Sequence, residues 1–188
     1  MELSFLARSR LISVAALAVP SAVAVALVCA GISVGASALG SSRAHQAIAR
    51  CSTPGMSVWI EKPAGNGALG SRYYYLRFTN LSGHTCELRG VPGVSAVSLS
   101  GARLGAPAGH VPARGPAQIL KTGATTSAQL KITVAGAVIG CHPRLSAGLR
   151  IYPPDNTVSR IVPFPAETCP QRFMFVSEVG PNEELEYP

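Results

Sequence analysis

The chain has 188 residues, 47% of them hydrophobic, and a formal net charge of +7. This length allows one domain with a hydrophobic core plus an N-terminal extension. The 16 lysines and arginines are scattered along the chain and form no run or patch, which argues against a nucleic-acid-binding protein.

Residues 1–38 are predicted to be a targeting segment. Arg8 and Arg10 precede an uncharged, apolar run over residues 11–35, which is longer than most signal-peptide cores and long enough to cross a bilayer as a helix. An Ala-Ser-Ala sequence that ends at Ala38 offers a cleavage site. Two alternatives remain open: a signal peptide cleaved near Ala38, which gives a secreted protein, or an uncleaved single-pass membrane anchor. Both place the rest of the chain outside the cytoplasm.

Four cysteines follow the targeting segment, and their even number in an exported chain predicts two disulfides. They are Cys51, Cys86, Cys141 and Cys169. Three pairings are possible, and we favour Cys51–Cys86 with Cys141–Cys169 because each of these bridges ties neighbouring segments. In the chain-entropy treatment, each bridge would stabilise the fold by roughly 3–4 kcal/mol.

After a predicted linker at residues 39–50, the exported region consists of short apolar runs separated by turns rich in glycine and proline. No stretch keeps a helical period for long, so these runs are predicted to be strands. They cover residues 57–62, 72–80, 93–100, 117–120, 126–134, 145–153, 158–164 and 171–178, and an acidic tail follows at 180–188. About eight strands predict an all-β fold, an immunoglobulin-like antiparallel β-sandwich over residues 51–179, preceded by the N-terminal hydrophobic helix.

The run at residues 72–80 alternates between two faces. The face that fits the core carries Tyr74, Leu76 and Phe78, and the opposite face carries Tyr73, Tyr75 and Arg77. Two tyrosine rings beside a guanidinium suit glycans, peptides or protein partners, so the second face is a candidate binding surface. The alternative is cross-strand packing on a half-buried sheet face. The positive charge of the exported region also predicts a weak, salt-sensitive attraction to anionic lipid headgroups and acidic wall polymers.

Two short motifs that are typical of enzymes occur in the wrong context. GNGALG at residues 65–70 matches the dinucleotide-binding pattern G-x-G-x-x-G, but a predicted strand follows it, whereas that loop must open a helix. The G-x-S-x-G match around Ser33 lies inside the apolar targeting run. Asp155 is the only aspartate, it lies in a turn sequence, and nothing in the pattern pairs a glutamate with a histidine. We therefore predict a protein without a cofactor and without enzymatic activity.

Three histidines, His84, His110 and His142, provide an alternative from another functional class. His84 lies two residues before Cys86, and His142 directly follows Cys141, which brings metal-ligating atoms close together. The second hypothesis is therefore an exported copper- or zinc-binding domain that uses these loop histidines. Against it, the chain lacks the closely spaced ligand pairs of zinc sites, and an oxidised cysteine is not a thiolate ligand.

The stretch FTNLSGHTCELRGVPGV at residues 78–94 resembles the signature of a family of exported bacterial domains known as domain of unknown function 4232. Other features that match are, in chain order, Cys51, Gly70-Ser71, the turn from Leu120 to Gly123, Cys141, Tyr152-Pro153-Pro154 and Cys169. Val91 departs from the pattern, because an aromatic residue is common before this proline. The resemblance covers residues 51–179 and implies an extracytoplasmic β-sandwich of high-GC Gram-positive bacteria, without a known activity or catalytic residues.

Taken together, these features predict a disulfide-stabilised envelope domain that binds or scaffolds. Envelope proteins, glycans and anionic wall polymers are the candidate partners. If the apolar run at residues 11–35 is not cleaved, it also holds the protein in the membrane.

Overall fold

The computed structural model describes residues 47–63, 65, 67–111 and 115–181. The predicted N-terminal hydrophobic helix, its cleavage site and most of the acidic tail lie outside these residues. Within the described part of the chain, no helix is long and apolar enough to cross a membrane.

All regular structure in the described residues is strand or short 3-10 helix, so the predicted all-β class is confirmed. The strands are β1 (Met56–Glu61), β2 (Gly67–Ala68), β3 (Ser71–Asn80), β4 (Cys86–Leu88), β5 (Gly93–Val97), β6 (Arg103–Leu104), β7 (Gly109–His110), β8 (Gln118–Leu120), β9 (Thr125–Thr133), β10 (Arg144–Leu145), β11 (Gly148–Tyr152), β12 (Arg160–Pro163), β13 (Glu167–Thr168) and β14 (Met174–Val176), and the 3-10 turns are η1 (Thr53–Gly55) and η2 (Ala135–Ala137). Each predicted run overlaps one strand, and the run at 145–153 also includes the last residue of β10. Six further strands of two or three residues are too short to show a period.

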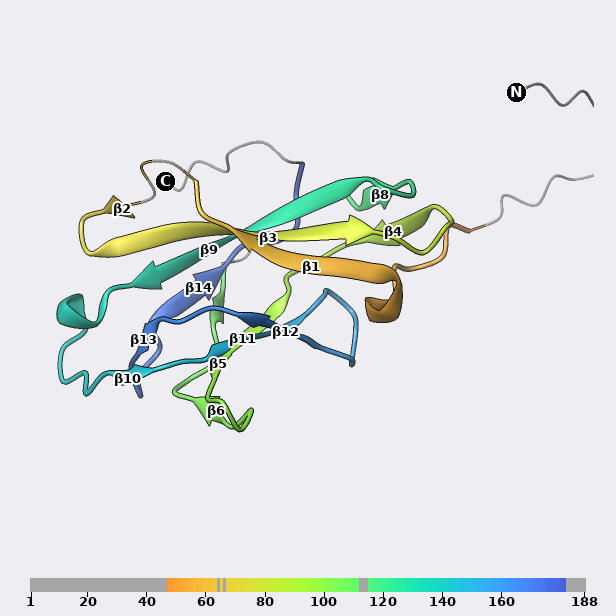
Figure 1. Cartoon of the computed structure of the whole chain (residues 1–188). Helices are drawn as coiled ribbons and strands as arrows, with labels where there is room; N and C mark the ends of the chain where they lie inside the picture. The colour runs from red at the N-terminus through yellow and green to blue at the C-terminus, as the bar shows by residue number, and fades with distance from the viewer. Residues whose placement is uncertain (1–46, 64, 66, 112–114, 182–188) are drawn as a thin grey trace, which may run out of the picture. The chain divides into compact units, whose positions relative to one another are not determined.

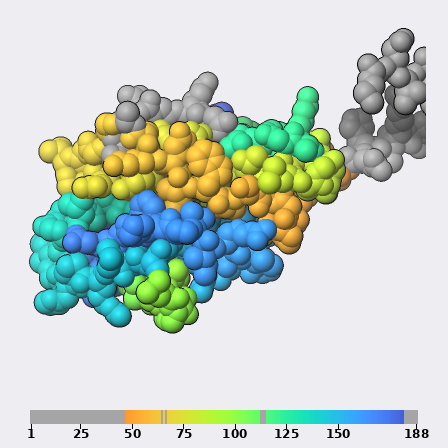
Figure 2. All heavy atoms as spheres, in the orientation of Figure 1, coloured from red at the N-terminus to blue at the C-terminus, as the bar shows by residue number. Residues whose placement is uncertain are grey.

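Two sheets lie against each other in a sandwich-like arrangement (Figure 1). The larger sheet has the order β1-β3-β9-β14-β7, with β2 added beside β3, and the smaller has the order β12-β11-β5-β6. Pairs β4–β8 and β10–β13 form two small ribbons. Strand pairing is antiparallel except between β14 and β7, which run parallel, so the prediction of a wholly antiparallel fold is wrong at this edge. On the face shown in Figure 2, β1 of the larger sheet lies beside β12 of the smaller one.

The core lies between the two sheets. On β3, Tyr74, Leu76 and Phe78 are buried, as the alternation predicts. Their neighbours on β9 are Ala128, Leu130 and Ile132, and the smaller sheet contributes Val94, Ala96, Leu149 and Ile151. Phe164 closes one side by packing its ring edge-on to Tyr74, with centroids 4.9 Å apart.

A fully buried amide joins three segments at the end of β3. The Asn80 side-chain nitrogen donates to the carbonyl oxygens of His84 and Leu120, each at 2.8 Å. Its side-chain oxygen accepts from the backbone nitrogen and the hydroxyl of Ser82, at 2.9 and 2.7 Å. All hydrogen-bonding groups of this side chain are therefore used, and β3, its following turn and β8 are fixed together.

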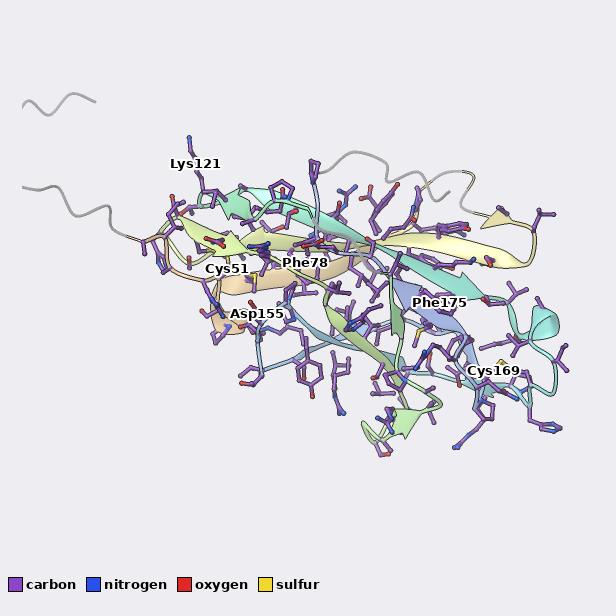
Figure 3. The ribbon with its side chains drawn as sticks, turned by 180° about the vertical axis from the view of Figure 1, so that it is seen from behind. Cys51, Phe78, Lys121, Asp155, Cys169 and Phe175 are labelled. Carbon is purple, nitrogen blue, oxygen red and sulfur yellow. A yellow bond between two sulfur atoms is a disulfide. The ribbon has the colours of Figure 1, made fainter. Side chains whose placement is uncertain are left out.

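The two disulfides lie at opposite ends of the domain (Figure 3). One joins Cys51 to Cys86, and the other joins Cys141 to Cys169. The favoured pairing is thus confirmed. The first bridge holds the segment that leads into the domain against β4, where the Cys51 amide also donates to the Glu87 carbonyl oxygen at 2.9 Å. The second links the loop after η2 to the residue after β13.

Removing the buried amide should be costly. Asn80→Ala leaves the buried carbonyl of Leu120 without its donor, and we expect the free energy of unfolding to fall by about 3 kcal/mol. Ser82→Ala is the matched control, because it removes only one donor from the same network and should cost about 1 kcal/mol. Urea unfolding of both variants measures the difference. Equal stabilities for the two variants would contradict this assignment.

The disulfide pairing has a chemical test. In the double variant Cys51→Ser/Cys86→Ser, Cys141 and Cys169 still form their own bridge, and both should resist alkylation of the native, unreduced protein. We expect this variant to lose roughly 3–4 kcal/mol of stability, because its unfolded chain is less constrained. Peptide mapping after alkylation locates any reactive thiol. Labelling of Cys141 or Cys169 would show that the bridges are arranged differently.

Candidate functional site

The predicted binding surface on β3 is largely occupied by contacts within its own sheet. Arg77 pairs with Glu61 on β1, where both its Nε and its Nη2 contact Oε2 at 2.5 Å. The guanidinium also lies over the Tyr75 ring, 4.9 Å from its centroid. Only 8% of Tyr75 and 14% of the Arg77 side chain are exposed, and Tyr73 is half-buried. These contacts are typical of cross-strand packing, and ligand binding by this face stays a prediction.

Trp59 is a more exposed aromatic residue on the same face. It is the register partner of Arg77 on the edge strand β1, and its indole nitrogen lies 3.5 Å from the Thr79 hydroxyl. Sequence reading missed it because no face can be assigned to the run at 57–62 until its partner strand is known. The antiparallel register supplies that assignment.

The three histidines lie in separate parts of the fold. His84 is in the turn between β3 and β4, His110 is on β7, and His142 follows the disulfide-bonded Cys141; all three are exposed. The described residues contain no group of three histidine, cysteine or acidic side chains placed to hold a metal ion. The geometry gives the metal-binding alternative no support.

The glycine-rich motif forms a hairpin. Residues 67–68 are β2, and Leu69-Gly70 is the two-residue turn that leads into β3. Both turn residues have positive φ, 33° for Leu69 and 80° for Gly70. This is the hairpin geometry in which Asn-Gly is preferred, because the left-handed region is unfavourable for a side chain such as leucine.

A charged cavity of about 390 Å³ lies beside the first disulfide. Arg50 and Asp155 form an exposed ion pair across it at 3.4 Å, and Glu178 accepts a hydrogen bond from the Gly115 amide at 2.9 Å. Glu87 and Arg89 complete the charged part of its lining. The described lining residues include no histidine, and the charged side chains are three carboxylates and two guanidiniums.

The opposite end of the domain carries aliphatic side chains in solvent. We call the four residues Leu69, Leu99, Ile139 and Leu145 the apolar tip cluster; their exposed fractions are 106%, 98%, 97% and 71%. Figure 1 shows the β2–β3 turn, η2 and β10 at this end. A Cβ added at Gly70 would lie 3.0 Å from the Cβ of Ala137, which places the first turn against η2.

Two cavities lie beside Leu145, and Leu69 and Ile139 line neither of them. One of about 340 Å³ is lined by Arg72, Tyr74, Ile132, Glu167 and the cluster residue Leu145, among others. The second, of about 530 Å³, runs from Leu145 to Leu99. Leu145 therefore forms a ridge between two hollows. The sequence did not single out these leucines, because an isolated leucine in a short run reads as a core residue.

No curated protein and no solved structure gives a significant match to this chain. A family model described as Domain of unknown function (DUF4232) matches residues 51–179, which include both disulfides and all fourteen strands of the described structure. The predicted resemblance is confirmed, and the chain belongs to this family.

Proposed function

We propose that this protein is a non-enzymatic binding or scaffolding domain that works outside the cytoplasm. Two disulfides support the location, since such bonds persist in oxidising compartments. In this proposal the sandwich is immunoglobulin-like, and it is either released after cleavage near Ala38 or tethered by the apolar run at residues 11–35.

The observation that carries the proposal is the apolar tip cluster. Leu69, Leu99 and Ile139 make almost no use of their side chains in the fold, because these are almost wholly in solvent. Leu69 also holds an unfavourable left-handed conformation. Residues that break a local rule without a gain in folding are expected where a protein meets a ligand or partner.

The loops that carry this cluster are braced rather than loose. Gln171 donates its side-chain amide to the carbonyl of Gly140 at 3.1 Å, next to Ile139 and to the Cys141–Cys169 disulfide. The Thr168 hydroxyl donates to the carbonyl of Arg144 at 2.8 Å, directly before Leu145. A surface that is ordered before contact loses less conformational entropy on binding. The backbone next to Ile139 and Leu145 is therefore already ordered before any partner binds.

A substitution in the hairpin separates function from folding. Leu69→Asn places a residue that tolerates positive φ in the turn, so we expect the free energy of unfolding to rise by about 1 kcal/mol. The control is Leu81→Asn, at a leucine that is 61% exposed and has no positive φ, and it should leave stability unchanged. Urea unfolding measures both. If Leu69 instead stabilises the fold, Leu69→Asn will lower the free energy of unfolding. That result would contradict a binding role for this side chain.

Contact in the cell is tested by photo-cross-linking. A photo-reactive amino acid at position 69 of the full chain should give a covalent adduct with a lipid, glycan or protein of the envelope when intact cells are irradiated. The same amino acid at position 81 is the control, because it lies at the opposite end of β3. Equal adduct yields at the two positions, or none at either, would overturn the proposal.

A further inference from the structure

We infer that the apolar tip cluster docks the domain onto an anionic lipid bilayer. This inference rests on the proposed binding function and names the partner of the same surface. Leu69, Leu99, Ile139 and Leu145 come from the β2–β3 turn, the β5–β6 loop and the segment from η2 to β10. Their side chains are exposed, and a hollow separates Leu145 from Leu99.

A set of protruding aliphatic side chains suits a deformable apolar phase. A rigid protein partner would need one pocket for each point, whereas the boundary between headgroups and acyl chains accommodates all of them at once. Figure 3 shows that this end, marked by Cys169, lies far from Cys51, where the chain enters the domain.

The charge around the cluster is complementary to anionic lipid. The loops that carry it span residues 67–72, 98–105 and 134–147, and the segment 165–173 is joined to the last of them by the Cys141–Cys169 disulfide. Together these four segments contain four arginines but only one acidic residue, Glu167. The four arginines, which we call the basic collar, are Arg72, Arg103, Arg144 and Arg172, and all are exposed. Gly105 packs against the backbone of Cys169, which brings the Arg103 strand to this end as well. Long arginine side chains reach headgroup phosphates while neighbouring leucines enter the apolar layer.

The other end of the domain lacks this combination. Its exposed aliphatic residues are less prominent: Ile48, Leu81, Ile119 and Val158 are 44%, 61%, 48% and 54% exposed. Two of its arginines lie beside acids, because Arg50 is paired with Asp155, and Glu87 and Glu178 line the same cavity as Arg89. A third, Arg160, donates to the carbonyl oxygens of Thr53 and Pro54. Contact between two copies through their tips is also disfavoured, because it would bring two basic collars together.

Membrane penetration can be measured by the fluorescence of a single tryptophan. The chain has one tryptophan, so Trp59→Phe gives a background in which Ile139→Trp reports from the tip and Leu81→Trp reports from the opposite end. The full-length variants are added to vesicles of phosphatidylglycerol mixed with phosphatidylcholine that is brominated on its acyl chains. We expect bromine to quench the tryptophan at 139 and to leave that at 81 unquenched. Both proteins carry the same targeting segment, so binding through that segment does not create the difference.

The basic collar is tested on the same vesicles. Arg72→Gln with Arg144→Gln should raise the lipid concentration for half-maximal quenching by about 25-fold, since each arginine near an anionic surface contributes about fivefold. Lys121→Gln, a change in the turn after β8 at the other end, should have little effect. Vesicles of phosphatidylcholine alone should give weaker quenching at 139 than vesicles with phosphatidylglycerol.

Several results would overturn the bilayer inference. Absence of quenching at 139, equal quenching at 81 and 139, or equal quenching with and without phosphatidylglycerol would each do so. A blue shift of the tryptophan at 139 that depends on protein concentration without lipid would identify a second copy of the chain as the occupant. If position 69 cross-links to an envelope protein while 139 is not quenched, the bilayer inference fails and the proposed binding function stands. If neither signal is seen, both fail.

Discussion

The pairing of β3 with β9 is the contact on which the rest of the structure depends. These are the two longest strands, and their antiparallel register runs from Ser71 opposite Thr133 to Thr79 opposite Thr125. One face of the pair supplies Leu76, Phe78 and Leu130 to the core. At one end of the β3–β9 pair lie Asn80 and the first disulfide. At the other end lie the Leu69 hairpin and η2. A slip of one residue would turn the core side chains outward.

The second constraint is that the connecting segments are fixed as firmly as the strands. Disulfides and side-chain amides hold described loops at both ends of the domain. A domain of this size buries a limited apolar area, and cross-links compensate for that in exported proteins. The same bracing lets the molecule hold leucine side chains in solvent. The disulfides and hydrogen bonds thus offset the unfavourable free energy of exposing these leucines to water.

The sequence shows which types of residue are available for the candidate site, but it does not show which of them lie side by side. Alternation predicts Tyr73, Tyr75 and Arg77 on the face opposite Tyr74, Leu76 and Phe78, because a strand has a period of two. In the structure Tyr75 is buried at 8% exposure, and Tyr73 and Arg77 are half-buried. Alternation did not reveal that Glu61 and Trp59 stand beside Arg77, since that depends on the register between β1 and β3. The exposed leucines were also missed. Exposure is set by what packs over a residue, and a run of two or three residues has no period from which to infer it.

By itself, the sequence determined the all-β class, the positions of the longer strands, the family, and a disulfide pairing that neighbouring segments favour. These follow from local periodicity, from cysteine count and from a motif, each of which is written in adjacent residues. Tertiary structure alone decided which edges lie together, that β7 and β14 run parallel, and that Leu69, Ile139 and Leu145 meet at one end in solvent. The physical reason is that burial and proximity are properties of contacts between segments far apart in the chain, which no local pattern records.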